Sequence, residues 1–135
     1  MNLCHFDALT GHQITILHFL LKLQALNEYE TLYLKTERTD ILYTISYLQF
    51  ELKNFNESLT NLDILINNSL TEETYVSVSK SDNSRQEILM RAQLHYLKGL
   101  IYSEQNNKDL AKISFEKSVE ISSDFQNAID KLNLL

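Results

Sequence analysis

Residues 92–125 read AQLHYLKGLIYSEQNNKDLAKISFEKSVEISSDF, and they carry the clearest structural signal in the chain. In and just before this segment, five residues recur at steps of four and three: Ile88, Ala92, His95, Gly99 and Tyr102. This spacing aligns them on one face of an α-helix and differs from the alternation of a β-strand. The pattern predicts a helix over 84–105 that begins with a capping box, in which Ser84 and Glu87 bind free backbone amides reciprocally.

A second helix follows almost at once. The asparagine pair 106–107 ends the first helix, because asparagine readily adopts the left-handed conformation that closes a helix. The second helix is expected over 108–121, with one face made of apolar and small residues: Leu110, Ala111, Phe115, Ser118, Val119 and Ile121. Ser123 and Gln126 then form the capping box of a last helix over 124–134.

The same helical pattern occupies the first half of the chain. Helices are expected over 39–52 and 55–66, with a break at Asn54 between them. The segment 11–26 is so broadly apolar that both of its faces require cover. A shorter helix is expected to follow it over 27–35, so that these two segments form a further helix pair.

The composition between the two halves is different. The segment 67–83 is rich in polar and acidic residues, so we expect an exposed insertion, with a short strand at 74–78 as the alternative. The length of 135 residues suits one domain spanning 1–135. The chain has no proline and only two glycines, which disfavours a turn-rich β-sandwich. The expected fold is therefore all-α.

The composition also excludes several classes of function. The net charge is -6 and no basic cluster is present, which argues against a nucleic-acid partner. The two glycines, Gly11 and Gly99, are too far apart to form a dinucleotide fingerprint or a phosphate-binding loop, so no cofactor is expected. The longest uncharged stretch, 8–21, is too short to span a membrane. Because residues 1–7 lack the basic residue of a secretory signal, we expect a soluble cytoplasmic protein.

Residues that could catalyse a reaction or hold a metal are scattered along the chain. His12 and His18 are six apart and lie on different helix faces, so they do not form the i, i+4 pair typical of a zinc site. Cys4 and His5 are adjacent, but no third group orients a nucleophile. His95 lies on the predicted apolar face, where a hydrogen-bonded core histidine is the simpler interpretation. We therefore expect no metal site and no enzymatic activity.

The two helices over 92–125 resemble a tetratricopeptide repeat. In that family, positions 8, 20 and 27 of the repeat are small, position 11 is aromatic and position 24 is large. In order along the chain, positions 8, 11, 20, 24 and 27 here hold Gly99, Tyr102, Ala111, Phe115 and Ser118. The small residues let the paired helices approach closely, while Tyr102 and Phe115 are expected to fill the space toward the next hairpin.

The resemblance extends with fewer matches over the rest of the chain. Residues 39–69 look like a second copy, and 13–37 could be a third. One helical hairpin cannot bury its own apolar face, and about three stacked units are usually needed for stability. The resemblance therefore implies a short right-handed solenoid of about three repeats, closed by the helix over 124–134 as a cap.

The repeat register also implies where a partner would bind. The first helices of the last two repeats would line a concave surface with Tyr43, Tyr47, Phe50, Gln93, Tyr96 and Leu100. Aromatic rings bury a large area at a low cost in entropy, which suits an apolar helix or an extended peptide. The alternative is that these rings only pack against neighbouring helices. The Lys and Asn with which chaperone-binding members of the family hold a C-terminal carboxylate are absent from these positions.

These observations favour a noncatalytic protein-interaction module, an adaptor or small subunit that holds a partner helix or peptide within a larger assembly. The alternative class is a bacterial peptide-sensing regulator or a secretion chaperone, since small proteins that resemble this family serve both roles. The apolar segment 11–26 could in addition serve as a contact between copies of the chain.

Overall fold

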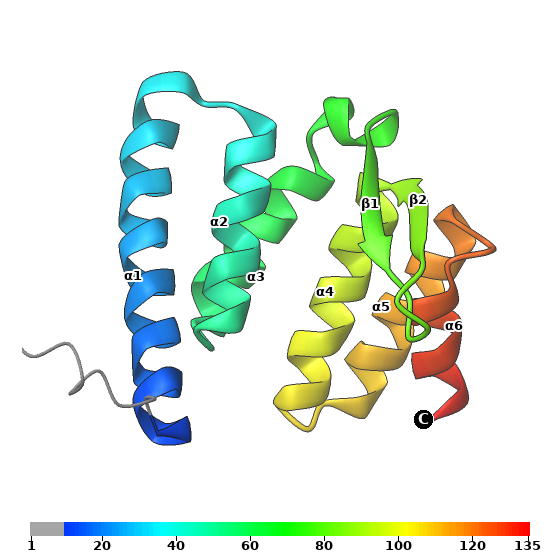
Figure 1. The fold of residues 1–135 in the computed structure, drawn as a ribbon. Coiled ribbons are helices and arrows are strands. Elements are labelled where there is room, and N and C mark those ends of the chain that lie inside the picture. The colour runs from blue at the N-terminus through cyan, green and yellow to red at the C-terminus, as the bar shows by residue number, and fades with distance from the viewer. Residues whose placement is uncertain (1–9) are drawn as a thin grey trace, which may run out of the picture.

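The computed structural model describes residues 10–135, and within this range the fold is all-α with one small β-hairpin (Figure 1). The helices are α1 (Gly11–Thr36), α2 (Thr39–Glu51), α3 (Phe55–Ile66), α4 (Met90–Glu104), α5 (Lys108–Ile121) and α6 (Gln126–Asn133). A 3₁₀ turn (Ser69–Glu72) and the antiparallel strands β1 (Tyr75–Ser79) and β2 (Arg85–Leu89) lie between α3 and α4. The expected helical class is confirmed.

Two helical hairpins stand side by side in the molecule (Figure 1). The first consists of α2 and α3, the second of α4 and α5, and α3 contacts α4 between them. At the two ends of this row, α1 packs against α2 and α6 packs against α5. The row is a helical-repeat arrangement, in which each hairpin covers an apolar face that its neighbour cannot bury alone.

Three clusters of buried apolar side chains hold the row together. The cluster that joins the two hairpins consists of Leu42, Leu62, Leu65, Met90, Leu94, Leu97 and Ile101. The cluster between α1 and α2 consists of Leu26, Ile41, Ile45 and Leu52. The third joins the β-hairpin to α4 and α6 and consists of Val78, Ile88, Ala92, Phe125 and Ala128. The β-hairpin is therefore part of the core.

Small residues set the separation of α4 and α5. Gly99 lies so close to Phe115 that a Cβ atom there would meet three ring carbons at 2.5, 2.6 and 2.8 Å. Ser118 donates its hydroxyl to the backbone carbonyl of Ala92 at 2.8 Å, and Ala111 is fully buried. The predicted contact of small residues is thus confirmed. The expectation for Phe115 was wrong in one respect, because its ring fills space within its own hairpin.

In the first hairpin, α2 and α3 also approach closely at small residues, which are serines here. Ser46 and Ser58 are fully buried, and the Ser58 hydroxyl donates to the backbone carbonyl of Ser46 at 2.8 Å. One turn further along, the Asn61 side-chain amide donates to Gln49 Oε1 at 2.9 Å. A hydroxyl bound to the facing backbone needs a close approach of the helices, so α2 and α3 pack by the rule that α4 and α5 follow.

The predicted helix pair at the start of the chain was wrong, since α1 runs without a break from Gly11 to Thr36. Asn27 costs only a few tenths of a kcal/mol within a helix. Leu26 on one side of it and Tyr33 on the other both pack against α2, which keeps the segment helical through Asn27. The helix begins with a capping box of Thr10 and Gln13.

The predicted helix start at Ser84 was also wrong. Residues 85–89 form β2, and α4 begins at Met90. Ser84 lies in the hairpin turn, where its backbone N–H donates to Asp82 Oδ1 at 2.9 Å instead of capping a helix. The alternative of a short strand at 74–78 is confirmed by β1. The segment 67–83 is not a wholly exposed insertion, because Thr71 and Val78 are buried.

The helix boundaries further along were predicted with mixed success. The turn between α4 and α5 is as expected, with Asn106 in the left-handed region (φ 58°) and the Asn107 side chain accepting from the Leu110 amide. The expected capping box of α6 is absent, since no side chain caps it locally. Instead, the Gln126 amide donates to Gln86 Oε1 of β2 at 3.3 Å.

The close approach at Gly99 yields a stability prediction. Gly99→Ala should lower the free energy of unfolding by about 1–3 kcal/mol, because the new methyl group meets a fully buried ring and forces Phe115 to move. Chemical denaturation at equilibrium measures this. The matched control is Gly11→Ala, where a Cβ atom meets nothing within 4 Å. Equal stability of the two variants would contradict the proposed contact.

Candidate partner-binding groove

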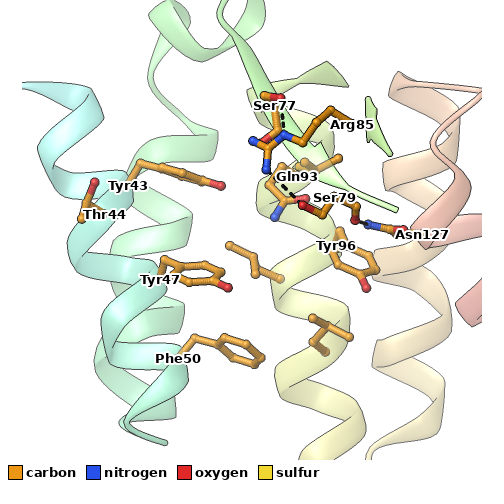
Figure 2. A pocket seen from close by; sticks show the side chains of 13 residues that line it. Tyr43, Thr44, Tyr47, Phe50, Ser77, Ser79, Arg85, Gln93, Tyr96 and Asn127 are labelled. Atoms are coloured by element: carbon orange, nitrogen blue, oxygen red, sulfur yellow. Dashed lines mark hydrogen bonds between the residues drawn. The ribbon is translucent and has the colours of Figure 1, made fainter. Parts of the chain in front are cut away.

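A groove lies between the first helices of the two hairpins (Figure 2). Its cavity volume is about 470 Å³, and residues of α2, α4, the β-hairpin and α6 line it: Tyr43, Thr44, Tyr47, Phe50, Ser77, Val78, Ser79, Arg85, Gln93, Tyr96, Leu97, Leu100 and Asn127. The volume lies in the range typical of sites that hold a ligand or part of a peptide.

All six residues predicted to face a partner line this groove. Tyr43, Tyr47 and Phe50 come from α2, and Gln93, Tyr96 and Leu100 come from α4. They meet because the two helices are the first members of neighbouring hairpins. The repeat register therefore predicted that these side chains share one surface, and their role in binding remains a prediction.

The aromatic side chains of the groove are held by one another and by the core. The rings of Tyr47 and Phe50 are 6.2 Å apart between centroids, and Tyr96 packs edge-on against buried Phe125 at 5.1 Å. Tyr47 keeps 39% of its surface exposed. Rings that are fixed in position but still open to solvent lose little entropy when a partner covers them.

Burial raises the pKa of each groove tyrosine above its ordinary value of 10.0. For Tyr43, a hydrogen bond with the Gln93 side chain opposes part of the rise. For Tyr47 and Tyr96, the next largest effect is the negative charge of Glu51 and Asp130, respectively. All three hydroxyls therefore stay protonated near neutral pH, and each can donate or accept a hydrogen bond.

Gln93 is the least satisfied polar side chain of the groove. It is 6% exposed, and its Oε1 atom has no hydrogen-bond donor among the described residues. A buried carbonyl without a donor costs roughly 1–3 kcal/mol. The Gln93 carbonyl is thus an acceptor without a donor, and because it is closed to solvent, an N–H group from outside the chain could satisfy it only after the side chains around it shift.

The sequence did not predict the part of the groove that comes from the β-hairpin and α6. Ser77, Ser79 and Arg85 line one end, and Asn127 of α6 lies beside them. Arg85 was missed because 84–105 was assigned to one helix. Ser77 and Ser79 were missed because 67–83 was expected to be an exposed insertion. A signal was present for the first strand, since Val76 and Val78 alternate with Ser77 and Ser79, and it gave the alternative of a short strand at 74–78.

Hydrogen bonds fix the β-hairpin over this end of the groove. Gln86 donates to the backbone carbonyl of Asp124 at 2.6 Å, and Asn127 donates to the backbone carbonyl of Ser79 at 3.0 Å. Together with buried Val78 and Ile88, these contacts join the hairpin to α6 and the loop before it. The hairpin is thereby held in a defined position relative to α4.

The histidines and other possible metal ligands among residues 10–135 are dispersed. No group of three or more His, Cys, Asp or Glu side chains there could hold a metal ion. His12 and His18 are exposed on α1, and Cys4 and His5 lie outside the described residues. His95 is half-buried on α4, and burial, followed by the charges of Lys117, Lys98 and Arg91, lowers its pKa to about 4.

The comparisons with known proteins agree with this geometry. The hairpins stacked side by side, with a groove between their first helices, define a helical-repeat protein. Residues 92–125, which span α5 and most of α4, match the family model of the tetratricopeptide repeat. The α4–α5 hairpin is thus a tetratricopeptide repeat, and it contains all five of the residues on which the resemblance was based. The match covers about a quarter of the chain.

The other comparisons add nothing to this assignment. Neither the curated proteins nor the solved structures contain a match to the chain. Within residues 10–135, no helix combines the length and the apolar character needed to cross a membrane.

The low pKa of His95 yields a prediction of pH dependence. The unfolded chain binds a proton at His95 near pH 6.5, but the folded chain does so only near pH 4. Its contribution to stability is therefore complete above about pH 6.5 and is lost as the pH falls toward 4. Chemical denaturation at about pH 7 and about pH 5 should show that the free energy of unfolding falls more for the wild type than for His95→Gln as the pH is lowered. An equal loss in both proteins would contradict this assignment.

Proposed function

We propose that this chain is a noncatalytic protein-interaction module, an adaptor or small subunit that holds a partner segment in the groove between α2 and α4. The tetratricopeptide repeat is in general a protein-interaction module, and α4 belongs to one. The single observation that supports the groove as the site is the convergence of six side chains from two hairpins on one cavity. No acid, base and nucleophile set lies among its described lining residues, in keeping with a role in binding.

The proposal treats α2 and α3 as a second, more divergent repeat. Its support is the shared contact of small residues, since Ser46 and Ser58 occupy the register positions that Gly99 and Ala111 hold in the matched repeat. In that register α2 and α4 are equivalent first helices. Equivalent helices set side by side produce a surface with a regular repeat, which suits an elongated partner.

The simpler interpretation of the aromatic residues is that they only fill space between helices. Phe50 does contact Phe55 within its own hairpin, at 6.3 Å between ring centroids. Tyr47, however, is 39% exposed, and the cavity remains open beside Tyr43 and Gln93. These features favour a surface that can bind a partner over the interpretation that the rings only fill space between helices.

Two finer roles would use the same groove. A peptide-sensing regulator or a secretion chaperone of this repeat class would also bind an extended segment there, and a panel of candidate peptides in a melting assay would reveal the cognate one by a rise in Tm. A cytoplasmic location is part of the proposal, supported by the single cysteine, since small secreted domains commonly depend on disulfides.

The groove proposal predicts the effect of losing its exposed ring. Once affinity purification with mass spectrometry has named a partner, Tyr47→Ala should weaken its binding by about 2 kcal/mol, because a central aromatic anchor is lost. Titration calorimetry measures this. Tyr75→Ala is the control, because Tyr75 is 64% exposed on β1 and does not line the groove. If Tyr47→Ala and also Tyr96→Ala, folded by circular dichroism, bind as tightly as the wild type, the groove is not the site.

We also propose that α1 joins two copies of the chain. The helix α2 ends at Glu51, whose carboxylate pairs with Lys22 at 3.4 Å, so residues 11–21 extend beyond it by about 16 Å. Every residue of this stretch is exposed, and none is charged: Ile14, Ile16, Leu17, Phe19, Leu20 and Leu21 are 40–54% exposed. An uncharged apolar surface can pair with its own copy without a complementary charge pattern, as homodimer interfaces do.

The α1 proposal is tested by the molecular mass in solution. Light scattering after gel filtration should give a dimer for the wild type and a monomer for Leu20→Glu, because a carboxylate would be buried without a partner at the interface. Leu134→Glu is the control, since Leu134 is 79% exposed at the other end of the chain, and it should remain a dimer. A monomeric wild type at micromolar concentration would contradict the proposal.

A further inference from the structure

Arg85 is the only charged residue among those that line the groove, and it has no carboxylate partner among the described residues. The other two arginines of the chain form ion pairs, Arg38 with Asp40 at 2.6 Å and Arg91 with Glu72 at 2.8 Å. In a chain with a net charge of -6, an arginine free of internal acids stands out. Its positive charge is available to a group from outside.

The hairpin holds the Arg85 guanidinium in a fixed position. Nε donates to Ser77 Oγ, one Nη to Ser79 Oγ and the other to the backbone carbonyl of Ser77, each at 3.0 Å. In Figure 2 the guanidinium reaches back over the strand toward Gln93. Three of its five N–H groups are thus used, and two are left for a further acceptor. A planar guanidinium with its position already set is well suited to bind a carboxylate.

Arg85 supplies the charge of the described groove lining, whereas Glu51 and Asp130, the acids that act on Tyr47 and Tyr96, are not lining residues. A negative group on a partner is therefore favoured at the hairpin end beside Arg85. Toward Phe50 and Leu100 the lining is apolar, so the same partner should place an apolar side chain there.

The unsatisfied carbonyl of Gln93 indicates the conformation of the partner. Its Oε1 is buried between these two regions and needs a donor. A partner helix offers free N–H groups only in its first turn, whereas an extended peptide offers one at alternate residues. An extended segment can therefore present an N–H group to Gln93 from one of its internal residues, whereas a helix could do so only from its first turn.

Resting on the proposed function of the groove, we propose that its partner is an extended peptide segment with an Asp or Glu side chain bound by Arg85, followed or preceded by an apolar residue between α2 and α4. The carboxylate is that of a side chain inside the segment. The peptide backbone donates an N–H group to Gln93. In this arrangement the repeats bind the apolar part, and the β-hairpin selects the charge.

Selection from a random heptapeptide library, displayed on phage without a free C-terminal carboxylate, tests this specificity. The wild type should enrich peptides with one acidic residue at a constant spacing from an apolar one. For a synthetic, C-terminally amidated peptide of this kind, Arg85→Gln should weaken binding about three- to tenfold and remove most of its salt dependence. Lys80→Gln, which removes the same charge from the hairpin outside the groove, should have little effect.

The outcomes separate this inference from the function on which it rests. If selected peptides lack an acidic preference, or bind equally to Arg85→Gln, while Tyr47→Ala still weakens binding, the groove stands and the role of Arg85 is refuted. If only a second library, displayed with a free C-terminal carboxylate, yields binding peptides, the inference of a side-chain acid is likewise wrong. If neither library yields a binding peptide, or Tyr47→Ala has no effect, the groove proposal itself fails. Restored binding of a Lys-substituted peptide by Arg85→Glu would support the direct contact.

Discussion

The close approach of α4 and α5 at Gly99 is the contact on which the rest of the structure depends. Since Gly99 lacks a Cβ atom, the ring of Phe115 occupies the space beside it and is fully buried. This contact fixes which face of α4 is turned toward α5. The opposite side of α4 is left to pack against α3 through Leu94 and Leu97 and to present its polar and aromatic residues beside α2. The groove between α2 and α4 thus follows from the contact that α4 makes with α5.

The groove itself combines two different structural elements. The helices provide aromatic and aliphatic walls at regular spacing, as is typical of stacked repeats. The β-hairpin, inserted where one hairpin of helices passes to the next, adds hydroxyls and one guanidinium at a single end. Repeats alone would give an apolar surface with little discrimination. A rigid insertion anchored to α6 adds a charged group in a defined position, which is a common way to gain specificity without changing the scaffold.

The sequence predicted the features that depend on short-range spacing. Gly99 and Ser118 were assigned correctly to the interface of one hairpin, and the repeat register brought Tyr47 and Tyr96 to one groove, because both rest on helical periodicity. The start of α4 was missed because Ile88 continues the helical spacing, although its long-range contacts with Val78 and Phe125 make it part of a strand. Such contacts cannot be seen in a local window, so Arg85 was missed as well.

The central claim is that a partner peptide lies along α2 and α4 with one end at the β-hairpin, and amide chemical shifts of the labelled protein test it most directly. Titration with a selected heptapeptide should move the signals of residues on the groove side of α2 and α4 and of β1 and β2, those of Gln93 and Ser77 among the most. Shifts confined to α1, or to the outer surface of α5 and α6, would contradict the account.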